Sequence, residues 1–292
     1  MEHIKPEFLE DYTRVIKDLN DPYISDRTIG ILEVLKGHYL IVDYFDREYG
    51  EGIGGVGPRD IGLLQSTMGR QLSSFSSFTK WDSSLDICST LFFGLIKNHP
   101  FHDANKRTAF LTLLYHLWKI RRKPIENQKV FEILALRVAS NTLNLYPEYK
   151  ESKLKTDQDK AVQCISKLLR KYTKELDRRE YIITFQDLNN ILRKFYCNLR
   201  DPDNNKIDVY IRVTRSSGFF SQRDYFDEKR VGSTGFPGWR NQVSKDDLKR
   251  VRQLTGLTAE NGYDSDTFYG DTDPLPALIP QYQKLLKRLS DK

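Results

Sequence analysis

The chain has 292 residues, of which 39% are hydrophobic and 29% charged, a composition typical of an ordinary soluble protein rather than of a disordered or membrane protein. No apolar run reaches the roughly eighteen residues that a membrane-spanning helix needs, and the start Met1-Glu2-His3 does not resemble a signal peptide. We therefore expect a cytoplasmic protein without membrane contact. Lys and Arg exceed Asp and Glu by 46 to 40, and the net charge of +6 fits solubility as well as it fits an acidic or nucleic-acid partner.

The length predicts about two domains. The three cysteines, Cys88, Cys164 and Cys197, are scattered without metal-binding spacing, as is typical of reduced thiols.

The first part of the chain predicts helices. A short helix and a turn are expected over residues 1–27, and apolar residues at helical spacing from Ile31 to Phe45 predict a second helix. His38 lies in that helix and is expected to pack rather than to catalyse. The glycines of residues 50–57 break regular structure but lack the spacing of a phosphate-binding loop. A short helix around residues 63–68 and a Ser-rich loop over residues 73–78 follow.

Two further apolar helical patterns, residues 85–96 and residues 105–118, flank a short polar connection. A helix begins with unpaired backbone N–H groups and therefore attracts anions. Lys106 and Arg107 fall on the first turn of the second helix, where the helix dipole disfavours cations. We infer that an anion such as phosphate compensates them.

The polar side chains of the connection suit distinct roles. His99 has an ordinary pKa near 6.5 and can accept a proton from an attacking hydroxyl. Asp103 offers the oxygen ligands that Mg²⁺ prefers. Phe101 is expected to anchor the loop.

The next three residues suit phosphate. Asn105 can orient a phosphate oxygen, Arg107 matches phosphate with its planar fork, and Lys106 adds a compact charge. The plainer alternative is a polar corner with a capping Asn and two solvated cations, and the density of functional groups argues against it.

The run His99-Pro100-Phe101-His102-Asp103-Ala104-Asn105-Lys106-Arg107 resembles the signature of the Fic/Doc family, which is His-Pro-Phe, any residue, Asp or Glu, Gly or Ala, Asn, Gly or Lys, Arg. The flanks at residues 59–66 and 94–98 are also similar to that family, and the resemblance covers about residues 28–145. It implies a mainly α Fic fold, a helical bundle with a small β flap. The flap, expected at about residues 52–60, docks the target as an added strand.

The subtype resembles Doc, because Lys106 stands where most Fic proteins have Gly. Fic proteins with Gly transfer AMP from ATP to a protein hydroxyl. The resemblance implies instead a Doc-like toxin that transfers the γ-phosphate of ATP, with Mg²⁺, to a Ser, Thr or Tyr hydroxyl of a target such as elongation factor Tu. In this assignment His99 is the base, Asp103 the magnesium ligand, and Ala104, Asn105, Lys106 and Arg107 bind the nucleotide phosphates. AMP transfer is the alternative.

Many Fic proteins carry an inhibitory helix with Ser or Thr four residues before a Glu that Gly or Asn follows. The pairs Glu51-Gly52, Glu126-Asn127 and Glu260-Asn261 lack that Ser or Thr. We therefore expect a separate antitoxin.

After the motif, Pro124 marks a turn at residues 121–124, and a helix is expected around residues 130–138. The first domain is thus predicted to span residues 1–147. Residues 148–178 form a connector, charged at its start and then an amphipathic helix.

Residues 179–292 are predicted to form a smaller α+β accessory domain of unknown function. Expected are strands at residues 181–183, 207–213 and 219–225, a turn at residues 201–205, and helices capped by Thr184 and Ser244 and near residues 282–289. This order faintly resembles double-stranded-RNA-binding-like modules, including HicA-type toxins. All five His residues precede residue 117, which argues against a second, RNA-cleaving site.

Cations of this half, such as Arg212 and Arg230, alternate with aromatic residues such as Tyr210, so RNA contact is an open alternative. We favour ordinary solvated charge. The aspartates of residues 264–273 lack the spacing of a calcium loop and are expected to cap a loop. A module that binds nucleic acid or antitoxin without catalysis is the alternative class of function.

Overall fold

The structure is a computed structural model of the chain. It describes residues 4–50, 55–75, 78–175, 182–215, 225–258, 261, 263, 268–269 and 273–290. The chain divides into two compact units, the first made of Met1–Glu180 and Tyr282–Lys292, the second of Tyr181–Gln281. Each unit is described by itself.

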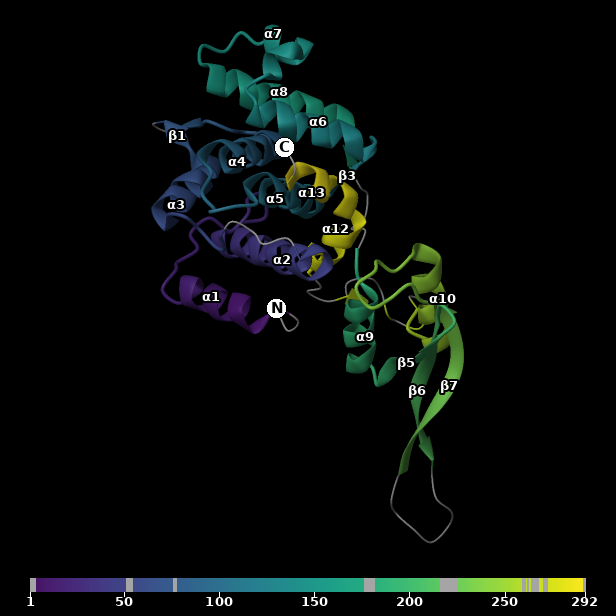
Figure 1. The fold of residues 1–292 in the computed structure, drawn as a ribbon. Coiled ribbons are helices and arrows are strands. Elements are labelled where there is room, and N and C mark those ends of the chain that lie inside the picture. Colours follow the sequence, from purple (N-terminus) through teal and green to yellow (C-terminus); the bar gives the residue numbers. More distant parts are fainter. Residues whose placement is uncertain are drawn as a thin grey trace. The chain divides into compact units, whose positions relative to one another are not determined.

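The first unit is a bundle of helices (Figure 1). Its helices are α1 (Pro6–Ile16), α2 (Ile31–Tyr49), α3 (Ile61–Gly69), α4 (Ser84–Asn98), α5 (Asn105–Lys119), α6 (Gln128–Ala139), α7 (Pro147–Lys150), α8 (Asp157–Tyr172) and α13 (Gln283–Ser290). Two antiparallel pairs of short strands accompany them, β1 (Ser74–Phe75) with β2 (Phe78–Thr79) and β3 (Arg122–Pro124) with β4 (Thr173–Glu175). The expected mainly α fold is confirmed.

Helix α5 lies at the centre of this bundle. It contacts α4, α2, α6 and α13, which explains why its sequence is apolar on more than one side. Helix α4 begins at the N-cap Ser83, whose hydroxyl accepts a hydrogen bond from the Asp86 N–H. The hairpin of α4 and α5 therefore carries the motif connection on a rigid, buried support.

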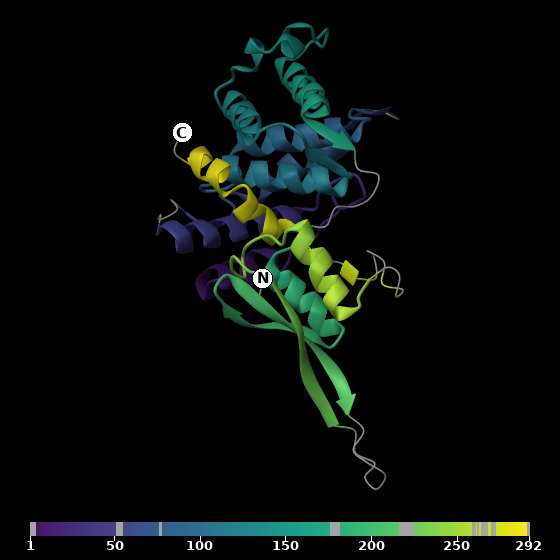
Figure 2. The ribbon, with the colours of Figure 1, turned by 90° about the vertical axis from the view of Figure 1, so that its right-hand side faces the viewer.

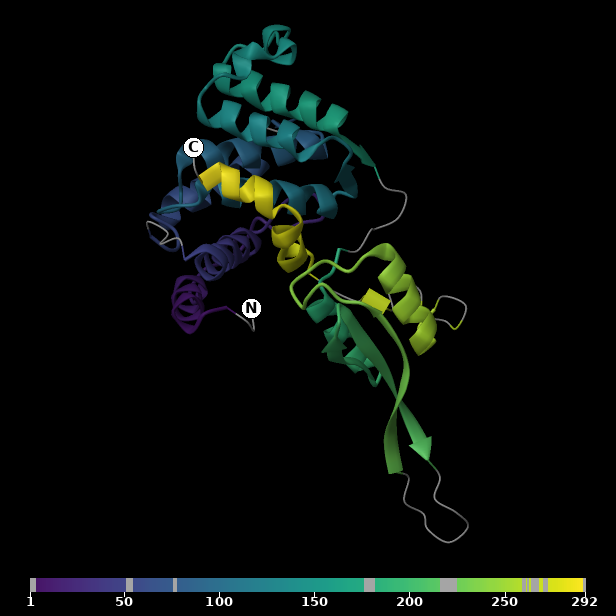
Figure 3. The same ribbon diagram turned by 45° about the vertical axis from the view of Figure 1, so that its right-hand side comes forward.

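Helix α8 and the terminal helix α13 both belong to the first unit. Helix α8 packs on α4, and α13 packs on α5 and α6 (Figure 3). The ring of Tyr282 meets Phe110 at a centroid distance of 5.8 Å, and Arg288 forms an ion pair with Glu132 at 2.6 Å. This division differs from the one suggested by sequence, which made residues 148–178 a connector and ended the accessory domain at residue 292.

The second unit is α+β, as expected (Figure 2). Its elements are α9 (Phe185–Lys194), β5 (Cys197–Asp203), β6 (Lys206–Arg215), β7 (Tyr225–Gly235), α10 (Lys245–Thr255) and α12 (Leu275–Gln281). The strands form one antiparallel sheet in the order β5-β6-β7. Its core is built from apolar residues of the sheet and of α9 and α10, among them Leu199, Val209, Phe185, Leu192 and Val251.

Several local predictions were wrong. Residues 122–124 form strand β3 rather than a turn, part of the Ser-rich loop is the β1–β2 pair, and residues 182–183 lie outside strands. Strand β5 extends through most of the expected turn. The turn itself consists of Asn204 and Asn205, whose backbones adopt the left-handed conformation. The third strand lies at Tyr225–Gly235, and residues 216–224 lie outside the described residues. These short pairings depend on distant partners that a local pattern does not contain.

Candidate functional site

The motif connection is strained at both ends. His99 at the end of α4 has φ 46° and Ala104 at the start of α5 has φ 58°, so both adopt the left-handed conformation. This conformation costs an L-residue about 1–2 kcal/mol. Such strain persists only where the surrounding contacts hold the loop in place, and it is common at functional sites.

Asn105 holds the loop through its own backbone. Its Oδ1 accepts a hydrogen bond from the Phe101 N–H at 2.9 Å, and its Nδ2 donates to the Phe101 carbonyl at 2.9 Å. The sequence suggested that this amide orients a phosphate oxygen, whereas the structure turns it toward the loop. Asn105 therefore stabilises the conformation of the motif loop through its backbone.

Phe101 is the apolar anchor of the loop. Its side chain is 1% exposed and stacks on the imidazole of His38 at a centroid distance of 4.0 Å and an angle of 12°. His38 is fully buried in α2, in agreement with its expected packing role.

The segment before α3 lies against the loop. Pro58 pairs with Phe101 in an isolated antiparallel bridge, the Arg59 N–H donates to the Pro100 carbonyl at 2.8 Å, and the His102 N–H donates to the Gly57 carbonyl at 3.3 Å. This is the place at which the flap was expected. Residues 52–54 of the expected flap lie outside the described residues.

The N-terminus of α5 has the features that attract an anion. The first hydrogen bond of the helix runs from the Thr108 N–H to the Ala104 carbonyl at 2.8 Å. The amides of residues 105–107 therefore lie before the regular hydrogen bonds of the helix. The positive end of the helix dipole adds to their attraction for phosphate. Lys106 lies on this turn and is half-buried.

Arg107 is a buried cation, with an exposed fraction of 3%. Its guanidinium lies over the Phe45 ring at 4.9 Å and approaches the Asp103 carboxylate at 3.8 Å. The Asp103 side chain is 43% exposed and so remains accessible. Within the described residues, no group of three or more His, Cys, Asp and Glu could hold a metal ion, but Mg²⁺ bound through substrate phosphates needs only one or two carboxylates. Asp103 therefore fits such an ion.

His99 is exposed, and its surroundings favour the neutral form of its ring. Partial desolvation of the ring, together with the cations Lys97, Arg59 and Lys106, lowers the pKa of His99 below its ordinary value. The neutral ring can accept a proton, as a general base must.

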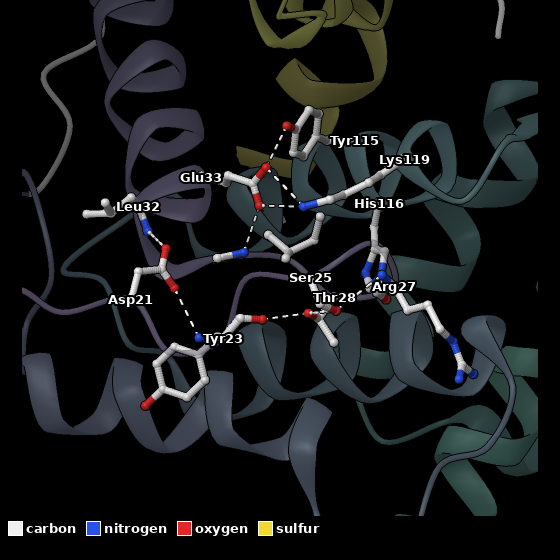
Figure 4. Close-up of polar contacts among 12 residues, drawn as sticks. Asp21, Tyr23, Ser25, Arg27, Thr28, Leu32, Glu33, Tyr115, His116 and Lys119 are labelled. Atoms are coloured by element: carbon white, nitrogen blue, oxygen red, sulfur yellow. Dashed lines mark hydrogen bonds and ion pairs between the residues drawn. The ribbon is translucent and has the colours of Figure 1, made fainter. Parts of the chain in front are cut away.

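A polar network fixes α2 against α5 at the ends away from the motif (Figure 4). The Asp21 carboxylate accepts hydrogen bonds from the first two amides of α2, those of Ile31 and Leu32. The Glu33 carboxylate accepts hydrogen bonds from Tyr115 at 2.7 Å and from Lys119 at 3.1 Å. The helix that carries His38 is thus tied to the helix that begins at the motif.

A comparison with family models covers the region that contains this loop. Residues 32–117 match the model of the Fic/DOC family. This part of the chain belongs to the Fic/DOC family. Membership supports a transferase that moves phosphate or AMP onto a target, and Fic/DOC proteins bind ATP together with Mg²⁺. No curated protein and no solved structure matches the chain.

The Fic/DOC match runs from α2 into α5 and so includes both the motif loop and the segment that pairs with it. Sequence reasoning did not assign His38, Gly57 and Thr108 to this site. The only signal for His38 was its position on the buried face of α2, which also predicts simple packing.

The cations of the second unit form a different environment on the outer face of the sheet. Arg200 pairs with Glu228 at 2.6 Å, Arg230 pairs with Asp208 at 2.7 Å, and Arg200 lies over the Tyr210 ring at 4.3 Å. Such internal pairing is typical of a solvated face, the interpretation favoured from sequence.

Two further sequence predictions concern the aspartates of residues 264–273 and the absence of a membrane-spanning segment. Asp273 accepts a hydrogen bond from the Leu275 N–H at 2.9 Å and caps α12, whereas Asp264, Asp266 and Asp271 lie outside the described residues. Among the helices that the structure describes, none is both long and apolar enough to cross a membrane.

Proposed function

We propose that the first unit transfers the γ-phosphate of ATP to a hydroxyl of a target protein. One observation carries this proposal: a single strained loop joins the neutral, exposed His99 to the helix N-terminus that bears Lys106 and Arg107. A base and an anion site six residues apart are the two parts that phosphoryl transfer requires.

His99 accepts the proton of the target hydroxyl while the hydroxyl oxygen forms a bond to the γ-phosphorus of ATP. The bond from the γ-phosphorus to the oxygen that bridges it to the β-phosphorus breaks, and ADP leaves. The first amides of α5, Lys106 and Arg107 stabilise the phosphate charge by position and electrostatics. Mg²⁺ held at Asp103 would neutralise part of that charge.

Lys106 favours γ-phosphate transfer over AMP transfer. A long cation on the first turn of α5 fills space beside the anion site and attracts the most highly charged end of the triphosphate. AMP transfer is the competing reaction, and it differs in which phosphorus is attacked.

We further propose that the protein is a Doc-like toxin of a toxin-antitoxin system in the cytoplasm, where ATP is abundant. The Doc pattern of residues 103–107 supports this, as does the lack of the inhibitory Ser or Thr before the Glu-Gly and Glu-Asn pairs of the sequence. Elongation factor Tu is the first target to test. A small protein encoded beside this gene should bind and silence the toxin when the two are expressed together.

Labelled ATP tests the proposal. The full chain is incubated with Mg²⁺, elongation factor Tu or a cell extract, and ATP carrying ³²P at either the γ or the α position. We expect γ-label on a protein band, no α-label, and no labelling by His99→Ala. An α-labelled band would show AMP transfer instead, and absence of both labels would favour a binding module.

A further inference from the structure

His38 connects three parts of the site from within the core. Its Nε2 accepts a hydrogen bond from the Gly57 N–H at 3.1 Å, and its Nδ1 lies 3.0 Å from the Thr108 hydroxyl oxygen. Its ring stacks on Phe101 of the motif loop. One side chain of α2 thus contacts the segment before α3, the motif loop and the first turns of α5.

The contacts fix the tautomer of this ring. A backbone N–H can only donate, so Nε2 must be the unprotonated nitrogen and Nδ1 carries the hydrogen that is donated to Thr108. Burial and the nearby Arg107 cation lower the pKa of His38 to about 3, so the ring stays neutral at physiological pH. Both hydrogen bonds therefore persist together.

Gly57 is closely surrounded on its other side. With φ 78°, it would place a Cβ 2.7 Å from the Tyr39 hydroxyl oxygen and 3.0 Å from the Asp11 carboxylate. The segment therefore passes through a slot between α1, α2 and the motif loop. The acceptor that Gly57 finds in this slot is His38.

We propose that His38 is a positioning residue that holds residues 57–59 against the motif loop. Through Gly57 it sets the backbone hydrogen bonds from Arg59 to Pro100 and from His102 to Gly57, which hold the part of the loop that follows the proposed base His99. This inference rests on the proposed function only for its effect on transfer. The positioning itself is a property of the fold.

Two substitutions separate the hydrogen bond to Gly57 from the one to Thr108. His38→Gln offers an amide oxygen at about the reach of Nε2 and can accept from Gly57. His38→Asn offers an amide nitrogen at about the reach of Nδ1, can donate to Thr108, and leaves Gly57 without an acceptor. Both lose the ring that stacks on Phe101, so each is the control for the other.

Amide hydrogen exchange of the full chain, followed by NMR, decides the question. We expect His38→Gln to retain the protection of the Gly57 and His102 amides, and His38→Asn to exchange there about tenfold faster or more, with protection in α8 unchanged. Equal protection of Gly57 in the two variants, whether kept or lost, would overturn the proposal. Should either variant fail to fold, the ¹⁵N shifts of wild-type His38 decide, because a protonated Nε2 contradicts the proposal.

The transfer assay adds the functional arm. His38→Asn should lower kcat/KM for the target at unchanged KM for ATP, while His38→Gln stays near wild type. Loss of Gly57 protection without any loss of transfer would overturn the role in the reaction. If the wild type transfers neither label, the proposed function fails, and the exchange comparison still decides whether His38 positions the segment.

Discussion

The motif loop of the first unit and the outer sheet face of the second are both rich in cations and aromatic rings, yet they differ in how the charges are used. On the sheet, Arg200 and Arg230 each meet a carboxylate within 2.7 Å. At the loop, Arg107 is buried over a ring, and its carboxylate neighbour Asp103 is 3.8 Å away. Cations held at a helix N-terminus can serve an anionic ligand, whereas cations in tight pairs already have one.

A high density of basic residues in a sequence therefore does not by itself locate a functional site. What distinguishes the loop is its strained backbone, the burial of Arg107 and its place at a helix N-terminus, and these are properties of the folded chain.

Removal of a polar side chain should lower the transfer rate strongly at the motif loop and hardly at all on the sheet. His99→Ala should reduce label transfer by about 10²–10⁴-fold, the usual contribution of a general base. Arg200→Ala on the sheet should leave transfer unchanged within about twofold, because Arg200 forms an exposed ion pair with Glu228. Initial rates with labelled ATP measure both, and equal losses in the two variants would contradict the distinction.

The two units should also differ in their response to acid. Burial lowers the pKa of His38 to about 3 and that of His116 to about 4, while the second unit contains no His. The unfolded chain protonates first as the pH falls, so this stability is complete above pH ~6.5 and is lost below it. At pH 5 each buried His should cost the first unit about 2 kcal/mol.

Urea unfolding at pH 7.5 and 5.0 measures this loss. His116→Gln should shrink the difference between the two pH values by about 2 kcal/mol, whatever it does to stability at pH 7.5. An unchanged difference would show that His116 is not buried in its neutral form.

The left-handed backbone at His99 predicts that glycine is more stable than alanine at this position. His99→Gly should be more stable than His99→Ala by about 1 kcal/mol, because glycine adopts φ 46° without the left-handed penalty, and both variants should be inactive. Thermal unfolding of the two variants provides the measurement. Equal stability would mean that the loop is relaxed at this position.

The smallest effect belongs to the sheet face. Arg230→Ala removes an exposed ion pair with Asp208 and should cost no more than about 1 kcal/mol, with no change in transfer. A larger loss of stability, measured by urea unfolding, would contradict the view that this ion pair is an ordinary exposed surface pair.

Much of the helical framework follows from local sequence. The apolar spacing predicted α4 and α5, and the Thr184-Asp187 capping box and the Ser244 cap marked the starts of α9 and α10. The β3–β4 pair and the return of α13 to the first unit join residues that are far apart in the sequence, and no local pattern announces them.

The sequence singles out the residues of the motif loop, but it does not predict which contacts each of them makes in the folded chain. The motif identified His99, Phe101 and the cations. That Asn105 bonds to the loop backbone and that His38 reaches Gly57 depends on where two helices meet, which one sequence does not contain.

If the first turn of α5 holds the end of ATP that is transferred, substitution of Lys106 should change which phosphate reaches the target. Wild type, Lys106→Ala and Lys106→Gly are compared for transfer of γ-label and α-label to the same target, with unfolding temperatures checked because glycine weakens a helix by about 1 kcal/mol. We expect the wild type to transfer γ-label and no α-label, and Lys106→Gly to transfer some α-label. Transfer of α-label by the wild type, undiminished γ-transfer in both variants, or the same labelling in all three proteins would contradict it.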